Sequence, residues 1–268
     1  MTLRDRSTPW RLINAYRHRI VDGVLHDIQL RYVGSVFGML WAVLYPAAQL
    51  MIYAVLYALV LRVRPGGLDG IEYTLLVFSG MVPLLAFTEA MVSSMNSLVA
   101  NRALLFNTVF PAELIPLRAA LAAQVPGLVG LLITLLLAVT LGRIAWVSVF
   151  IIPILWCALI MFATGIGWTL SLLTLVTKDI SHGIGLVTML LFILSPFAYT
   201  PEMVPSALKA VLWLNPLSYF VLSFQDLLCF ARMPPAGVLS GALLLGTGVF
   251  LGGFAVFQRG KRVFFDYA

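Results

Sequence analysis

Residues 31–64 read RYVGSVFGMLWAVLYPAAQLMIYAVLYALVLRVR, and this stretch decides the class of the protein. It is almost wholly apolar, contains no acidic residue, and has arginines at both ends. An α-helix rises about 1.5 Å per residue and the hydrocarbon core of a bilayer is about 30 Å thick, so a helix of this length can cross it with some tilt. A membrane-spanning helix is therefore predicted here.

Large aromatic residues recur along this first span at steps of four or eight. They are Phe37, Trp41, Tyr45, Tyr53 and Tyr57, with Gln49 filling the gap in the series. Residues four apart lie on nearly one face of a helix, so the spacing predicts a face lined with rings. Because Trp and Tyr also gather at membrane interfaces, an interfacial belt is the alternative.

The composition of the whole chain agrees with a membrane protein. Of its 268 residues 61% are hydrophobic and 10% are charged, whereas about a quarter of a soluble domain is charged. An ordinary soluble domain is thus excluded. The two cysteines, Cys157 and Cys229, have no CxxC or histidine neighbour and predict neither a metal site nor a disulfide framework.

The apolar runs predict an all-α integral membrane protein with six transmembrane helices. Residues 1–35 are expected to form cytoplasmic and interfacial helices, residues 36–257 the transmembrane domain, and residues 258–268 a cytoplasmic tail. The expected spans are 36–61, 73–98, 117–141, 146–176, 184–199 and 238–257. Glycine pairs four apart (Gly34 and Gly38, Gly237 and Gly241, Gly248 and Gly252), together with Gly165 and Gly167 in the fourth span, predict close helix approach.

The basic residues set the expected orientation. With both termini in the cytoplasm, twelve of the 17 basic residues fall inside, and Arg62, Arg64, Arg143, Lys209 and Arg232 fall outside. This is the arrangement that the positive-inside rule favours. The net charge of +6 then follows from topology and requires no nucleic-acid partner.

The N-terminal region has the pattern of an amphipathic interfacial helix. Trp10, Ile13, Tyr16, Ile20 and Val24 recur at steps of three and four, while the arginines lie largely on other faces. The helix would be either a basic anchor or a part that moves during function.

Two connecting segments differ from simple loops. Residues 101–116 (NRALLFNTVFPAELIP) put apolar side chains on a cytoplasmic loop, which suggests that another protein docks there. Residues 201–216 (PEMVPSALKAVLWLNP), outside between spans five and six, contain an apolar piece at 207–214 that is too short to cross. This outer segment is expected to be re-entrant or to lie at the interface.

Motifs for catalysis are absent from the sequence. It has no G-x-x-x-x-G-K-[ST], no G-x-S-x-G and no H-E-x-x-H, and its three histidines are scattered, so no catalytic or metal site is expected. Glu89 is the one carboxylate near the middle of a predicted span. It is either a hydrogen-bonded contact beside Thr88, Ser93 and Ser94 or the functional acid of an ion-coupled transporter.

Several short sequence motifs, taken in their order along the chain, resemble those of the ABC-2 type permeases that export bacterial surface polysaccharides. They are RYVGSVFGMLWAVLYP at 31–46, FNTVFPAELIPL at 106–117, KDI at 178–180, SPFAYTPEMVP at 195–205, LNPLSYF at 214–220 and FQRGKRVFFDYA at 257–268. The short length and the RVFFDYA ending look most like the capsular polysaccharide exporter subunit, with the O-antigen type as the alternative.

The resemblance implies a bacterial inner-membrane permease that works as a pair with two P-loop ATPase subunits. ATP and Mg would be used by those subunits, and this chain would hold no cofactor. Coupling to the ATPase would fall to Arg102, Phe106, Phe110, Pro111 and Glu113. The first and fifth spans of the two copies would line a polysaccharide channel with Phe37, Trp41, Tyr45, Gln49, Tyr53, Tyr57, Phe192, Phe197 and Tyr199.

Several properties stay open at this point. A periplasmic co-polymerase or adaptor protein is a further expected partner. An ABC-2 exporter of teichoic acid, small drugs or lipids is an alternative with the same layout. An ion-coupled secondary transporter that uses Glu89 is an alternative of a different class.

Overall fold

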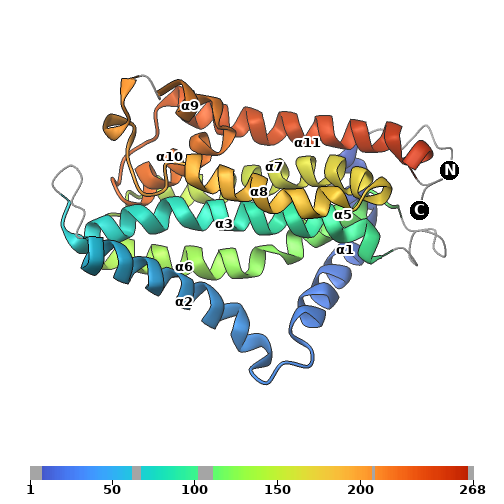
Figure 1. The fold of residues 1–268 in the computed structure, drawn as a ribbon, viewed down its shortest axis with the longest axis horizontal. Helices are drawn as coiled ribbons and strands as arrows, with labels where there is room; N and C mark the ends of the chain where they lie inside the picture. Colours follow the sequence, from blue (N-terminus) through green and yellow to red (C-terminus); the bar gives the residue numbers. More distant parts are fainter. Residues whose placement is uncertain (1–7, 62–67, 102–110, 207–208, 265–268) are drawn as a thin grey trace.

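The computed structural model describes residues 8–61, 68–101, 111–206 and 209–264, and every regular element in these ranges is helical (Figure 1). Short 3₁₀ turns at Gly38–Leu40 and Pro201–Met203 and a π-helical stretch at Val55–Leu61 accompany the α-helices. In chain order the α-helices are α1 (Pro9–Tyr32), α2 (Trp41–Ala54), α3 (Gly70–Ala100), α5 (Leu114–Ala122), α6 (Gln124–Thr140), α7 (Ser148–Val176), α8 (Asp179–Leu194), α9 (Lys209–Leu214), α10 (Pro216–Leu228) and α11 (Ala236–Phe264).

Five helical stretches in the described residues are long and apolar enough to cross a membrane, and each coincides with a predicted span. They are Gly38–Tyr57, Gly70–Ala100, Leu114–Thr140, Ser148–Val176 and Ala236–Lys261. At the predicted fifth span, 184–199, the helix has the expected length but begins and ends five residues closer to the N-terminus. This helix, α8, has 16 residues and ends at Leu194, because Pro196 follows its C-terminal cap residue Ser195. Sixteen residues extend about 24 Å, less than the thickness of a bilayer core.

Helix α3 forms the centre of the bundle, packing against α5, α6, α7 and α10 (Figure 1). In the most apolar 18-residue stretch of α3, 78% of the residues are buried, whereas in that of the first span 17% are buried. Stacked aromatic rings connect three helices in the core. The ring centroid of Phe162 on α7 lies 5.2 Å from that of Phe87 on α3 and 5.6 Å from that of Phe220 on α10. The first span therefore lies at the edge of the bundle.

Helix α7 packs closely along α11 because glycines lie at the contacts. A Cβ on Gly165 would lie 2.3 Å from the Val249 carbonyl oxygen, and one on Gly253 would lie 2.1 Å from the Gly165 carbonyl oxygen. The prediction of close approach is thus confirmed for Gly165, and likewise for Gly167 and Gly241. At Gly34, Gly38, Gly237, Gly248 and Gly252 no described atom of the same chain lies within 4 Å of an added Cβ, so close approach at these positions stays a prediction.

The segment between α8 and α11 differs from the prediction. The apolar piece at 207–214 is only partly described, and its helix α9 (Lys209–Leu214) buries only Leu212. The buried short helix is α10, in a stretch for which no helix was predicted, and 11 of its 13 residues are buried. Asn215 begins α10 by accepting a hydrogen bond from the Leu217 amide, and Pro216 occupies the first turn, where its missing N–H costs nothing.

Helix α1 lies against the end of the bundle where α11 also ends (Figure 1). Its predicted apolar face is partly confirmed, because Ile13, Tyr16, Ile20 and Val24 pack against the bundle, together with Leu12. Trp10 is 57% exposed, and the centroid of its ring lies 5.7 Å from that of Phe250 on α11.

Candidate functional site

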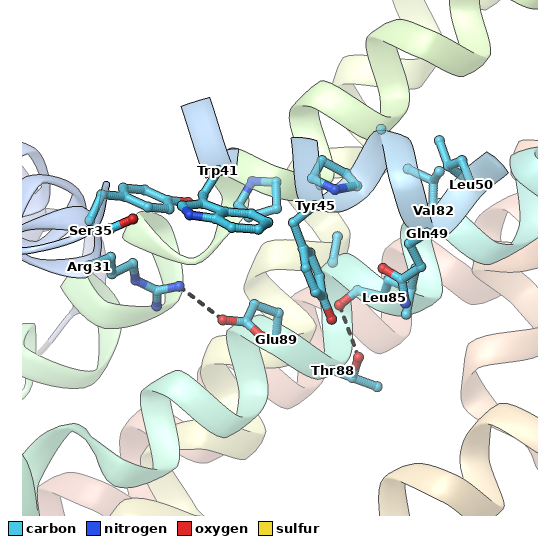
Figure 2. Close-up of a pocket in the computed structure, with 16 residues that line it drawn as sticks. Arg31, Ser35, Trp41, Tyr45, Gln49, Leu50, Val82, Leu85, Thr88 and Glu89 are labelled. Atoms are coloured by element: carbon cyan, nitrogen blue, oxygen red, sulfur yellow. Dashed lines mark hydrogen bonds and ion pairs between the residues drawn. The ribbon is translucent and has the colours of Figure 1, made fainter. Parts of the chain in front are cut away.

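A cavity of about 620 Å³ separates α2 from α3 and α6 (Figure 2). The turn between α1 and α2 creates this separation, because Gly34 and Gly38 adopt positive φ angles of 80° and 49° that few other residues tolerate. Figure 1 shows the resulting wedge, in which α1 and α2 meet at the turn and diverge from it. On the opposite wall Gly127 and Gly130 of α6 bring that helix close to Ala86 and Val82 of α3.

Three of the predicted channel residues line this cavity. Trp41, Tyr45 and Gln49 project from α2, and Thr88 and Glu89 of α3 lie across from them (Figure 2). The rings present apolar faces, while the amide, hydroxyl and carboxylate groups can form hydrogen bonds. A cavity with this mixture can hold an amphipathic ligand.

Arg31, at the end of α1, makes the main polar contact of the cavity. Its guanidinium donates to the Glu89 carboxylate at 2.9 Å (Figure 2). It also donates to the Ser93 hydroxyl at 2.7 Å. Glu89 is therefore not held by the hydroxyl of Thr88, which donates to the Leu85 carbonyl oxygen. The sequence analysis missed this pair, because its members lie 58 residues apart and no local pattern connects them.

Four of the other predicted channel residues form a second group. The ring of Tyr53 stacks on that of Tyr57 with a centroid distance of 6.4 Å. Its centroid also lies 6.3 Å from that of Phe192 and 6.4 Å from that of Phe197. Phe192 and Phe197 are themselves 4.5 Å apart. Rings from the first span therefore meet those at the end of α8.

Two predicted channel residues lie beside these groups. Phe37 contacts Trp41 edge to face at 5.6 Å, and 52% of its surface is exposed. The Tyr199 hydroxyl donates to the Leu194 carbonyl oxygen at 3.2 Å. Among the side chains that the structure describes, no three His, Cys, Asp or Glu groups come together in a way that could hold a metal ion.

At the opposite end from α9, the residues expected to couple to an ATPase are only partly described. Arg102, Phe106 and Phe110 lie outside the described residues. Pro111 precedes α5, and its carbonyl oxygen accepts from the Leu114 amide at 3.0 Å.

Glu113 is buried and tied to two other helices. Its carboxylate accepts from Lys261 and, at 3.1 Å, from Gln258, both on α11. Its backbone carbonyl accepts from the indole N–H of Trp168 on α7 at 2.7 Å. The C-terminal part of the predicted docking loop is thus fixed to α7 and α11. The sequence analysis missed these partners, which are 55 to 148 residues away along the chain.

The apolar helices and the cavity between them define a multi-pass membrane protein. The family model described as ABC-2 type transporter matches residues 26–229, and the chain belongs to that family. The resemblance found in the sequence is thereby confirmed. Permeases of this family work with ATPase partners in ABC exporters.

Several characterised relatives are similar over most of their length. The chain is 30% identical over 204 residues to an O-antigen export system permease protein RfbA of Klebsiella pneumoniae, covering 75% of this chain and 76% of the relative. A second protein of that name from the same organism is 28% identical over 241 residues, with coverage of 89% and 90%. The polysialic acid transport protein KpsM of Escherichia coli is 24% identical over 200 residues, with coverage of 74% and 76%.

Proposed function

We propose that two copies of this chain, with two ATPase subunits, export a surface polysaccharide across the bacterial inner membrane. The observation that carries the proposal is the ring-lined cavity between α2 and α3, in a chain whose relatives are named as O-antigen and polysialic acid transport proteins. Both termini would lie in the cytoplasm, and α8 would complete a six-span bundle despite its length.

The chemistry of such a cargo suits the cavity and the ring cluster beyond it. Sugar rings carry hydroxyl groups at their edges and apolar C–H groups on their faces. Trp41, Tyr45 and Tyr53 offer flat surfaces for those faces, and Gln49 offers an amide for the hydroxyls. Many similar weak contacts let a polymer slide without being trapped at any one of them.

The relatives favour an O-antigen type of polymer over a capsular one. Identity to the two Klebsiella O-antigen permeases is 30% and 28%, against 24% for the polysialic acid protein. The RVFFDYA ending had favoured the capsular type, and its last four residues lie outside the described residues.

A second copy would complete the channel. None of the 16 residues of α8 is buried, and α2 exposes Val43, Leu44, Met51 and Ile52. Two neighbouring helices that bear predicted channel residues thus present apolar surface outside the bundle. Pairing of two copies along α2 and α8 would enclose the rings between them.

The test is complementation of a strain that lacks this chain, with surface polymer as the readout. Trp41→Ala combined with Tyr45→Ala is expected to abolish or strongly reduce export while the chain remains in the membrane. The matched control is Trp146→Ala with Phe150→Ala, which removes two exposed rings four residues apart that do not line the cavity.

Three results would count against the proposal. Export that does not depend on the chain, or normal export by the Trp41 and Tyr45 double variant, would contradict it. Loss of all transport in Glu89→Gln without any ATPase requirement would instead establish the ion-coupled alternative.

A further inference from the structure

A second cavity, of about 500 Å³, lies at the end of the bundle that carries α9. It is separate from the ring-lined cavity, and no residue lines both. Its walls include Trp213 of α9, Asp226 of α10, and Phe230 and Arg232 from the turn that follows α10. Glu202, from the turn before α9, lines the same space.

The turn after α10 has an unusual backbone. Ala231 has a φ of 49°, and it is the one non-glycine residue with positive φ in the described chain. Such conformations are uncommon for residues with a Cβ and concentrate at functional sites. At this position the conformation places the neighbouring side chains on one wall, where the Arg232 guanidinium lies 5.0 Å from the Phe230 ring.

Asp226 holds that wall in position. Its backbone carbonyl accepts from the Arg232 amide at 2.9 Å, and its carboxylate accepts from the Arg232 Nε at 2.6 Å. The side chain of Asp226 is 8% exposed, while that of Arg232 is 61% exposed. A buried carboxylate is thus combined with an accessible guanidinium and an aromatic ring.

The remaining polar groups are also fixed. The amide of Gln225, which is 1% exposed, donates to the carbonyl oxygens of Pro196 at 2.8 Å and Phe197 at 3.2 Å. A side-chain hydrogen bond with Thr200 is the main cause that lowers the pKa of Glu202, so this group is a carboxylate at neutral pH. Preorganised polar groups of this kind lose little entropy when a ligand binds.

We propose that this outer cavity binds a segment of neutral sugar residues in the polymer that the permease exports. The inference rests on the proposed function and adds a recognition site outside the channel. Trp213 and Phe230 provide faces for sugar rings, and Asp226, Glu202 and Arg232 provide charge-assisted hydrogen bonds to hydroxyl groups.

The charged groups that line the outer cavity favour neutral sugars over acidic ones. The lining contains two carboxylates and one guanidinium, and Asp226 already pairs with that guanidinium. Among the described lining residues Arg232 is the one cation, and an acidic sugar would meet repulsion from Glu202.

The test is photo-crosslinking in cells that are exporting their own polymer. A benzophenone-bearing amino acid replaces Met203, which lines the cavity and is 46% exposed. The control places the same amino acid at Leu214, which is 81% exposed on α9 but does not line the cavity. After irradiation the purified chain is stained for periodate-oxidisable glycan and, separately, digested with protease.

The expected result is a polydisperse, glycan-positive adduct at position 203 that is absent at position 214 and in cells that make no polymer. Trp213→Ala and Asp226→Asn, each combined with the position 203 probe, should lower its yield about tenfold. Because Trp213 is 40% exposed and caps no helix, its variant remains informative if Asp226→Asn misfolds.

Other results would overturn the inference. A discrete, protease-sensitive adduct without glycan would show that the cavity docks a protein. Normal export with no glycan adduct at position 203 would refute sugar binding there and leave the proposed function intact. Failure of the proposed function would appear separately, as surface polymer that does not depend on this chain.

Discussion

The Glu113 carboxylate shows how burial sets the importance of a single ion pair. Its side chain is 5% exposed and that of its partner Lys261 is 31% exposed. In the Arg31–Glu89 pair the Glu89 side chain is 52% exposed and that of Arg31 is 27% exposed. Loss of one partner leaves an uncompensated charge in both cases, but only in the first is that charge held away from water.

We therefore expect different effects of removing the two cations. Lys261→Met should lower the free energy of unfolding by about 3 kcal/mol, and Arg31→Met by less than about 1 kcal/mol. Unfolding midpoints of the purified protein in one detergent give the comparison. Equal shifts would show that burial does not decide the strength of these pairs.

Cys229 offers a second test at this scale. Burial raises the pKa of its thiol to about 12, and a raised pKa means less thiolate at any lower pH. The folded protein should therefore react with maleimide at pH 8 far more slowly than the unfolded protein does. Mass spectrometry of a Cys157→Ser variant measures this, with the unfolded protein as control. Rapid labelling of the folded protein would contradict the buried position of Cys229.

At the scale of elements, the contact between α7 and α11 depends on glycines at particular positions. Gly165→Ala is expected to destabilise the protein by about 1–3 kcal/mol, because the new Cβ would lie 2.3 Å from the Val249 carbonyl oxygen. Gly248→Ala on α11 is the matched control, since nothing lies within 4 Å of its Cβ position. It should be neutral or slightly stabilising, as alanine favours a helix over glycine. Similar losses in both variants, measured as unfolding midpoints, would contradict this packing.

The long helices could be predicted from sequence, and the short buried one could not. An apolar run of at least 20 residues predicts a span, because a helix of that length and composition can cross the hydrocarbon core of a bilayer. The spans Gly38–Tyr57 and Ser148–Val176 could be predicted in this way. Helix α10 has only 13 residues and includes the polar Gln225 and Asp226, so neither its length nor its composition predicts a span. Only the tertiary structure supplies the partners, Pro196 and Arg232, that allow these polar side chains to be buried.

The predicted ring-lined face was found only in part for a related reason. Four-residue spacing correctly grouped Trp41, Tyr45 and Gln49, because it follows from helix geometry. The rings of Tyr53 and Tyr57 instead join Phe192 and Phe197, and helical spacing within the first span says nothing about a distant helix.

At the scale of the whole molecule, α7 and α11 connect the two ends of the bundle (Figure 1). Glu113 is tied to both helices at one end, and Val238 near the start of α11 lines the outer cavity at the other. Movement of the segment before α5 would thus be transmitted along a closely packed helix pair.

This connection predicts uncoupling when the Glu113 contact to α11 is removed. In the complex with its ATPase, Lys261→Met should retain ATP hydrolysis while exporting less polymer per ATP consumed. The control is Arg259→Met, which removes a cation two residues away on the same helix with no contact to Glu113 among the described bonds. Hydrolysis and export that fall in parallel would indicate lost assembly instead of lost coupling.

The most direct test of the central claim is native mass spectrometry of the tagged chain, purified gently from its own membranes. A permease that exports polysaccharide with separate ATPase subunits should appear as two copies of this chain with two copies of one P-loop ATPase. An intact, stable chain that reproducibly carries no ATPase would contradict the proposed function and direct attention to Glu89.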